Sequence, residues 1–195
     1  MKRLMDIFGS ILGLAFIIPL APFIALAILF EDGWPFVIKL NRVSAGRIIK
    51  IYKFRSMKKH AEYDKALLQN INERNDGPLF KSKNDPRVTK IGKFLRRTRL
   101  DEFPQFINVL KGELSLVGPR PHEPEEMLKY PPEYWQIFLA KSGLTGLSQI
   151  TARPFLPFQK ELELDLIYLK KQSLWFDFKI IFKTVIIFLA RHDGI

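Results

Sequence analysis

Two adjacent carboxylates, Asp101 and Glu102, directly follow a run of arginines at positions 96, 97 and 99. Carboxylates beside cations are the groups that metal-assisted chemistry on a phosphate ester requires. Pro104 suits the first turn of a helix and Gly112 suits its C′ position, so we expect a helix between them. The carboxylates would then lie at or just before its N-terminus, where the helix dipole favours anions. A helix cap within a surface charge cluster is the alternative, because Asp is common at helix starts.

The composition limits the classes of function. The chain has 195 residues, which suffices for one domain with a core, and a net charge of +11, which indicates an anionic partner. Its hydrophobic content of 47% and aromatic content of 13% favour a membrane surface over nucleic acid. No cysteine is present, which excludes disulfides and thiolate chemistry. With only three histidines as well, a zinc site is not expected.

Residues 7–30 form an apolar segment without a charged side chain, preceded by Lys2 and Arg3. The length suffices for a spanning helix, and a signal peptide is a further alternative, although the small-residue cleavage pattern is poor. Pro19 and Pro22 lie in the middle, where proline bends a helix. Basic residues flank both ends, and positive charge prefers the cytoplasmic side. We therefore expect a re-entrant helix hairpin bent at Pro19 and Pro22, with a spanning helix as the alternative.

The remaining chain indicates a small β-hairpin among helices. Residues 36–57 predict a hairpin that turns at Ser44-Ala45-Gly46 and places Lys53 near the end of its second strand. After Asp85 and Pro86, a basic helix is expected over residues 87–99, with cations that suit anionic lipid. Further helices are expected over residues 161–172 and 174–190. The last is too short and too charged to span a bilayer, so we expect it in the interface or on the core.

These elements predict an α+β fold that is mainly α with one small β-hairpin. Residues 1–32 would form the re-entrant membrane anchor. Residues 33–195 would form a compact catalytic domain at the membrane interface, surrounded by amphipathic helices. No internal repeat and no second domain are evident.

Several short motifs occur in order along the chain: Lys53-Phe54-Arg55-Ser56-Met57, Asp85-Pro86-Arg87-Val88-Thr89-Lys90-Ile91-Gly92, Leu100-Asp101-Glu102-Phe103-Pro104-Gln105, Asn108-Val109-Leu110-Lys111-Gly112, Gly118-Pro119-Arg120-Pro121, Gly143-Leu144-Thr145-Gly146, and Asp165 with Tyr168. In this order and spacing the chain resembles the bacterial sugar transferase family. Its members are monotopic phosphoglycosyl transferases that begin glycan assembly on a polyprenyl phosphate. No single motif is decisive, but the ordered set is highly specific.

The resemblance implies an enzyme on the cytoplasmic face of the bacterial inner membrane, in contact with anionic lipids. It would use Mg²⁺ to move a sugar-1-phosphate from a UDP-sugar to polyprenyl phosphate, and release UMP. Asp101 would be the nucleophile of a covalent aspartyl phospho-sugar, and Glu102, with Asp101, would bind the metal. The remaining site residues implied are phosphate-binding Lys53, Arg96, Arg120 and Arg153, and the supporting Asp165 and Asp177. No nucleic acid partner is implied.

Three departures from the family pattern stand out. One is Ser142 before Gly143, where the family has Pro-Gly-Leu-Thr-Gly. The family usually has Ser-Pro at the membrane bend, where this chain has Ile18-Pro19, and it has Gly-Arg where this chain has Ala152-Arg153. The residues identify neither the sugar nor the glycan pathway, and both a monomer and a homodimer are consistent with them. The alternative function is a non-catalytic, basic, membrane-anchored module that binds anionic lipid or nucleic acid. That alternative does not account for the ordered motifs.

Overall fold

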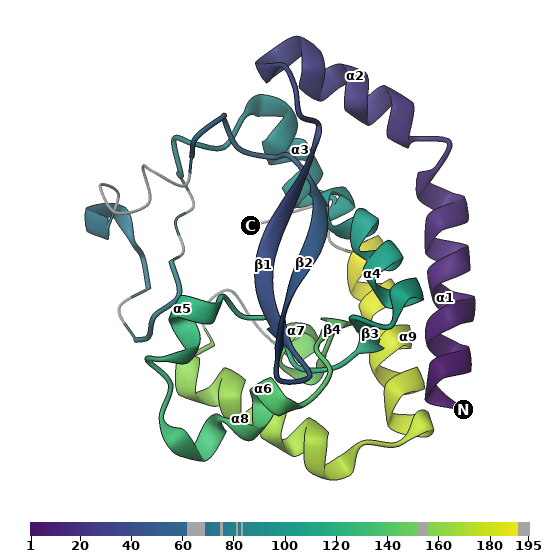
Figure 1. The fold of residues 1–195 in the computed structure, drawn as a ribbon, viewed down its shortest axis with the longest axis vertical. Coiled ribbons are helices and arrows are strands. Elements are labelled where there is room, and N and C mark those ends of the chain that lie inside the picture. Colours follow the sequence, from purple (N-terminus) through teal and green to yellow (C-terminus); the bar gives the residue numbers. More distant parts are fainter. Residues whose placement is uncertain (62–68, 75, 81, 83, 152–155, 191–195) are drawn as a thin grey trace.

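A computed structural model describes residues 1–61, 69–74, 76–80, 82, 84–151 and 156–190. Helices dominate, and the one long hairpin crosses the middle of the molecule (Figure 1). The elements are α1 (Lys2–Ile17), α2 (Ala21–Asp32), β1 (Val37–Ser44), β2 (Arg47–Phe54), η1 (Gln69–Ile71), α3 (Lys90–Arg97), η2 (Leu100–Gln105), α4 (Phe106–Lys111), β3 (Ser115–Val117), α5 (Pro124–Met127), η3 (Pro132–Tyr134), α6 (Gln136–Leu139), β4 (Gly143–Thr145), α7 (Leu147–Thr151), α8 (Phe158–Lys171) and α9 (Leu174–Ala190). The predicted α+β class is confirmed.

The N-terminal apolar segment forms two helices instead of one. α1 ends at Ile17 and α2 begins at Ala21, and the two axes are bent by 59° at the break that contains Pro19. Proline at 19 lacks the N–H that would continue the helical ladder, and Pro22 suits the first turn of α2. Among the described residues no single helix is both long and apolar enough to cross a bilayer, although the bent pair passes that test together.

The hairpin has the predicted strands and turn. β1 and β2 pair antiparallel from Val37 opposite Phe54 to Ser44 opposite Arg47. The two turn residues, Ala45 and Gly46, both have positive φ angles, of 51° and 70°. A two-residue turn of this kind matches the right-handed twist of paired strands. A second, short parallel pair of β3 and β4, which the sequence analysis did not anticipate, joins Ser115 to Gly143.

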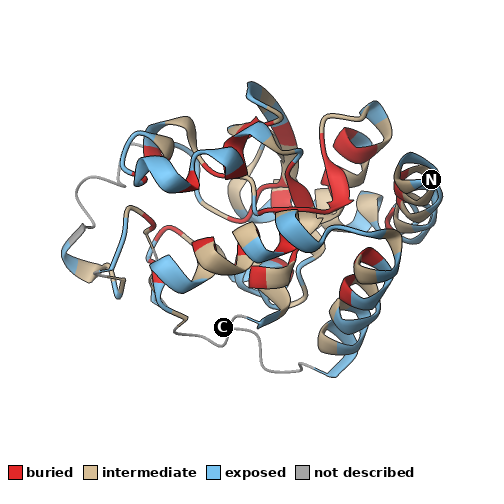
Figure 2. Cartoon of the chain, turned by 90° about the horizontal axis from the view of Figure 1, so that it is seen from below, coloured by how far each residue is buried: buried red, intermediate tan, exposed pale blue. Residues whose placement is uncertain are grey.

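The core lies where the hairpin meets the central and C-terminal helices. One buried cluster joins Ile51 of β2 to Val109, Leu114 and Val117, and to Tyr168 of α8. Buried positions gather inside the body, and exposed positions line the outer faces of the helices (Figure 2). Large apolar side chains are exposed on α1, α2 and α9, among them Phe8, Leu12, Phe16, Phe23, Phe30, Trp175, Phe178, Phe182 and Leu189.

Several predicted helix boundaries were wrong. The basic helix α3 begins at Lys90, not at residue 87, because Thr89 is its N-cap and its hydroxyl accepts the Gly92 N–H. Asp85 does not start a helix, because its carboxylate pairs with the Arg87 guanidinium at 2.7 Å. Pro104 lies in the 3₁₀ helix η2, so α4 begins only at Phe106. α8 begins at Phe158, before the expected residue 161, whereas α9 has the predicted bounds.

Candidate active site

The two adjacent carboxylates lie in η2 and share one lysine from β2. Lys53 Nζ is 3.2 Å from Asp101 Oδ2 and 3.0 Å from Glu102 Oε1. The Asp101 side chain is only 7% exposed, whereas that of Glu102 is 42% exposed. One carboxylate is therefore sheltered from water and the other faces it, although both contact the same ammonium group.

A tight reversal of the chain at Arg99 presents these carboxylates to the hairpin. Arg99 adopts a left-handed conformation with φ of 53°, between the end of α3 and the start of η2. A non-glycine residue in this region costs about 1 kcal/mol or more, and such residues cluster at functional sites. At the other end, Gly112 has φ of 81° and ends α4 in the predicted C′ conformation.

Asn108 holds α4 against the edge of β2. Its side-chain Oδ1 accepts the Tyr52 N–H at 3.0 Å, and its Nδ2 donates to the Lys50 carbonyl at 2.8 Å. The same Nδ2 donates to the Glu113 carboxylate, and Asn108 is fully buried. An amide side chain thus bonds β2 as a neighbouring strand would, next to Lys53. This role of Asn108 is not predictable from the sequence, because only the fold brings its side chain to β2.

Burial and neighbouring charges shift the pKa values of Asp101, Glu102 and Lys53 in different directions. Burial raises the pKa of Asp101 above its ordinary value, although the charge of Lys53 opposes this. Burial acts in the same direction on Glu102, but Lys53, Arg120 and Arg99 outweigh it and lower its pKa. Burial disfavours the Lys53 ammonium, yet the two carboxylates hold its pKa above the usual range. Asp101 is therefore the more sheltered of the two carboxylates, and it lies beside two cations, Lys53 and Arg96.

Three of the four predicted phosphate-binding residues lie around this pair. Besides Lys53, Arg96 of α3 is close enough for its charge to act on Asp101, and its Nε donates to Ser56 Oγ at 3.0 Å. The positive charge of Arg120 helps to lower the pKa of Glu102. Arg153 lies outside the described residues. Arg99 was not among the predicted site residues, but its charge also helps to lower the pKa of Glu102.

The two predicted supporting carboxylates have different surroundings. Asp165 of α8 accepts hydrogen bonds from Ser148 Oγ at 2.6 Å and from the Arg120 backbone, so it supports Arg120 directly. Asp177 of α9 instead binds Lys2 Nζ at 2.6 Å and accepts the Tyr168 hydroxyl at 2.7 Å. These contacts join Asp177 to the start of α1, and no described contact joins it to Asp101.

Asp165→Asn is expected to flatten the pH dependence of stability. Burial raises the pKa of Asp165 to about 7, so between the unfolded value of 3.8 and pH 7 the folded protein holds the extra proton. Stability must then fall as pH rises through this interval, and an amide removes that fall. Melting temperatures in detergent between pH 5 and 8 would test this, with exposed Glu163→Gln as control. Equal slopes for wild type and Asp165→Asn would contradict the prediction.

The donor set fits a magnesium ion shared with a substrate. Among the described residues no group of three or more His, Asp or Glu side chains is placed so that it could hold a metal ion by itself. Mg²⁺ is commonly held by one or two carboxylates, with phosphate oxygens and water completing its shell. Asp101 and Glu102 supply two such carboxylates, next to arginines that suit phosphates. The pair therefore suits a metal that binds together with a diphosphate.

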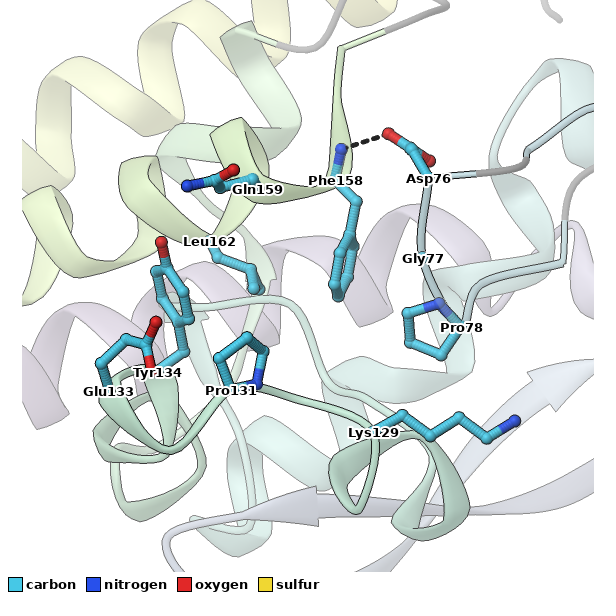
Figure 3. A pocket seen from close by; sticks show the side chains of 10 residues that line it. All are labelled: Asp76, Gly77, Pro78, Lys129, Pro131, Glu133, Tyr134, Phe158, Gln159 and Leu162. Carbon is cyan, nitrogen blue, oxygen red and sulfur yellow. Dashed lines mark hydrogen bonds between the residues drawn. The ribbon is translucent and has the colours of Figure 1, made fainter.

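A cavity of about 570 Å³ lies apart from these residues, between α8 and the segments that precede it (Figure 3). Phe158 and Leu162 form part of its lining, with the polar side chains of Asp76, Lys129 and Gln159 around them. The Phe158 N–H donates to the Asp76 carboxylate there, as the dashed line shows (Figure 3). Of the predicted site residues that the structure describes, none lines this cavity.

Known proteins similar to this chain were found by two comparisons. The model of the family described as bacterial sugar transferase matches residues 1–191. The galactosyl transferase CpsE of Streptococcus agalactiae serotype III (strain NEM316) is 44% identical over 186 residues, which cover 94% of this chain and 41% of the relative. The UDP-glucose:undecaprenyl-phosphate glucose-1-phosphate transferase of Escherichia coli (strain K12) is 41% identical over 194 residues, covering 95% of this chain and 39% of the relative.

A third relative is similar along its whole length. The exopolysaccharide production protein PSS of Rhizobium leguminosarum bv. phaseoli is 37% identical over 210 residues, covering 100% of this chain and 98% of the relative. By contrast, the chain spans about two fifths of the length of the other two relatives.

Proposed function

This chain belongs to the bacterial sugar transferase family, and we propose that it transfers a sugar-1-phosphate from a UDP-sugar to polyprenyl phosphate. The products would be polyprenyl-diphosphate-sugar and UMP, in the first membrane step of glycan assembly. The observation that carries the proposal is the sheltered Asp101 beside the more exposed Glu102, both held by Lys53 among arginines. The Escherichia coli relative is a UDP-glucose:undecaprenyl-phosphate glucose-1-phosphate transferase, which supports the same reaction.

The reaction would proceed in two displacements at phosphorus. A carboxylate oxygen of Asp101 attacks the phosphorus that bears the sugar, and the bond from that phosphorus to the UMP oxygen breaks. The aspartyl phospho-sugar that remains is then attacked by an oxygen of polyprenyl phosphate. The bond between Asp101 and phosphorus breaks, and the free carboxylate is restored. No oxidant or further co-reactant is needed.

The residues around Asp101 have separate roles in this scheme. Lys53 orients both carboxylates before the substrate binds, and its ammonium can then contact a phosphate oxygen. Arg96 and Arg120 neutralise the diphosphate, which otherwise repels an attacking anion. Glu102 and Asp101 would hold Mg²⁺, which, when bound, withdraws charge from the phosphate oxygens and stabilises the leaving group. Asp165 orients the Arg120 backbone.

We propose that α1 and α2 form a re-entrant hairpin in one leaflet of the inner membrane, with the remainder on the cytoplasmic side. Both ends of the helix pair bind the same body of the protein. At the start, Lys2 Nζ binds Asp177 at 2.6 Å. At the end, the Glu31 carboxylate accepts the backbone N–H groups of Lys90 and Ile91 at the start of α3. A spanning segment would place these two ends on opposite sides of the bilayer.

Three further features support attachment to an anionic membrane surface. α1, α2 and α9 expose large apolar side chains, and α3 carries Lys90, Lys93, Arg96 and Arg97. Basic residues near an anionic bilayer contribute about 1 kcal/mol each. Attachment at this depth is chemically necessary, because the phosphate of a polyprenyl carrier stays at the headgroup plane. Both a monomer and a homodimer are compatible with these features.

The reaction is tested by UMP release from a panel of UDP-sugars, with purified protein in detergent and polyprenyl phosphate. We expect Mg²⁺-dependent release with one or a few of the sugars, and a lipid-soluble product that contains the sugar. The non-catalytic alternative, a basic membrane module, requires that no sugar in the panel yields UMP above the level without enzyme. Release of free sugar phosphate without a lipid product would also contradict the proposed transfer.

The proposed topology predicts that the N-terminus is inaccessible from the periplasm. Lys2 binds Asp177, so the reporter cysteine is placed in a short tag before Met1 and not at Lys2. A second cysteine at exposed Lys160 serves for comparison. In intact cells both should resist a membrane-impermeant thiol reagent, and both should react after permeabilisation. Labelling of the tag alone in intact cells would contradict the re-entrant arrangement.

A variant without the two prolines can convert the re-entrant hairpin into a spanning helix. Replacing Pro19 and Pro22 together by leucine restores a continuous helix that is long enough to span. We expect the tag in this variant to react from the periplasm in a fraction of molecules. Those molecules must lose the contacts of Lys2, so the melting temperature should fall as well.

A further inference from the structure

The inward face of α1 carries two glycines, Gly9 and Gly13, one helical turn apart. A glycine within a helix costs about 1 kcal/mol relative to alanine, so a packing reason is expected. A methyl group at Gly13 would overlap three atoms of the Phe106 ring, and one at Gly9 would overlap the Leu116 side chain. Small residues spaced four apart let a helix approach its neighbour closely. Both glycines thus provide room for side chains of the catalytic body.

Polar contacts hold this face of α1 in register. The Asp6 carboxylate is buried and accepts the Leu116 N–H at 2.8 Å and the Ser115 hydroxyl at 2.9 Å. The Arg3 guanidinium donates to the carbonyl groups of Val109 and Leu110 at the end of α4. α1 therefore cannot slide or rotate on the body without breaking buried hydrogen bonds, each of which is costly to lose.

Phe106 connects this contact to the carboxylates. It is the first residue of α4, and its backbone N–H donates to the Phe103 and Pro104 carbonyls of η2. Its ring also packs edge to face against Phe103, with 5.4 Å between the centroids. Phe103 directly follows Glu102, and its ring contacts the Phe16 ring of α1, with 5.5 Å between the centroids. A displacement of the Phe106 ring can thus be transmitted through Phe103 to the segment that carries Asp101 and Glu102.

We propose that Gly13 is a positioning residue for the reaction: the space it leaves for Phe106 sets where η2 holds Asp101 and Glu102. The inference rests on the proposed transferase function. The membrane helix would then be part of the catalytic framework as well as an anchor. The alternative is that α1 only anchors the chain and brings it to its lipid substrate.

The test compares Gly13→Ala, Phe106→Leu, the double variant, and Ala15→Leu as a control on the exposed side of the same helix. UMP release is measured with and without polyprenyl phosphate, since an anchor for the lipid substrate matters only when lipid is present. We expect Gly13→Ala to lower both rates by about tenfold to a hundredfold, because small misplacements of reacting groups are that costly. The KM for the UDP-sugar should change less than threefold, and membrane flotation should not change.

Rescue distinguishes positioning from general damage. Phe106→Leu removes part of the ring that meets the added methyl group, so the double variant should recover to within about threefold of Phe106→Leu alone. Ala15→Leu should match the wild type in every assay. The proposal is overturned if Gly13→Ala is as active as wild type, if only the lipid-dependent rate falls, or if the double variant is no better than Gly13→Ala.

A second measurement does not depend on activity. Amide hydrogen exchange of residues 100–106 in nanodiscs should accelerate in Gly13→Ala, return toward wild type in the double variant, and stay unchanged in Ala15→Leu. Unaltered exchange of this segment in Gly13→Ala would overturn the positioning role. If the wild type itself released no UMP, the proposed function would fail, and the exchange data would still decide the structural inference.

Discussion

Asp101→Asn is expected to abolish turnover and to prevent formation of any covalent sugar-phosphate adduct. An amide carries no charge and is a poor nucleophile, whereas the Asp101 carboxylate is sheltered, with its pKa raised by burial. With wild-type enzyme, a UDP-sugar and no lipid acceptor, we expect release of at most about one UMP per active site. The intact mass should rise by one sugar phosphate, and a peptide map should place the addition on Asp101.

The competing mechanism is direct attack by polyprenyl phosphate, with Asp101 serving as a base or a metal ligand. It predicts no UMP before lipid is added, and kinetics of a ternary complex in place of ping-pong kinetics. Both observations together, with an enzyme shown to be active, would refute the covalent step while leaving the overall transfer intact. Asp101→Asn must also melt near the wild-type temperature, since otherwise its inactivity could reflect loss of the Lys53 contact.

Glu102→Gln is expected to lower turnover by at least about a hundredfold with the fold preserved, in line with the loss of one preorganised charged group. The amide keeps the shape of the side chain but removes the charge that would bind Mg²⁺. Because the side chain is 42% exposed, the substitution should cost little stability. The residual activity should require more Mg²⁺ than the wild type requires. Turnover as a function of Mg²⁺ concentration measures both effects.

Exposed Glu163 provides a matched control, because its carboxylate pairs with Lys160 on the surface of α8, away from Lys53. Glu163→Gln should have wild-type turnover and an unchanged Mg²⁺ requirement. A Glu102→Gln enzyme with near-normal turnover at low Mg²⁺ would eliminate the metal-binding role. A large loss of activity together with an unchanged Mg²⁺ requirement would restrict Glu102 to orienting Lys53.

Predictions from short-range patterns were the most accurate for the fold. The turn at Ala45-Gly46 followed from the strand patterns on either side of a glycine-containing segment, and α9 has the bounds expected for the apolar segment over residues 174–190. The helix boundaries were predicted wrongly where more than one side chain could cap the start of the same helix. Asp85 pairs with Arg87 and so does not start a helix, and Thr89 takes over as the N-cap of α3. Such competition is decided by a few tenths of a kcal/mol to about 1 kcal/mol, which local propensities do not resolve.

The sequence by itself determined that carboxylates and arginines lie together, because Asp101, Glu102 and Arg99 are neighbours along the chain. It also determined the bend of the N-terminal segment, because Pro19 cannot continue a helical ladder. Residue order therefore sufficed to bring the carboxylates and arginines together and to favour a bent segment over one straight membrane helix.

The family resemblance named Lys53 and Asp177, but only the tertiary structure decided which contacts these distant groups make. Lys53 reaches both carboxylates because Asn108 bonds β2 to α4, and Asp177 binds Lys2 at the far end of α1 instead of joining Asp101. The partners in these contacts are separated by tens of residues or more in sequence. Their pairing depends on how apolar faces pack and on which buried polar groups find partners. Both are properties of the assembled fold, so no local pattern in the sequence encodes them.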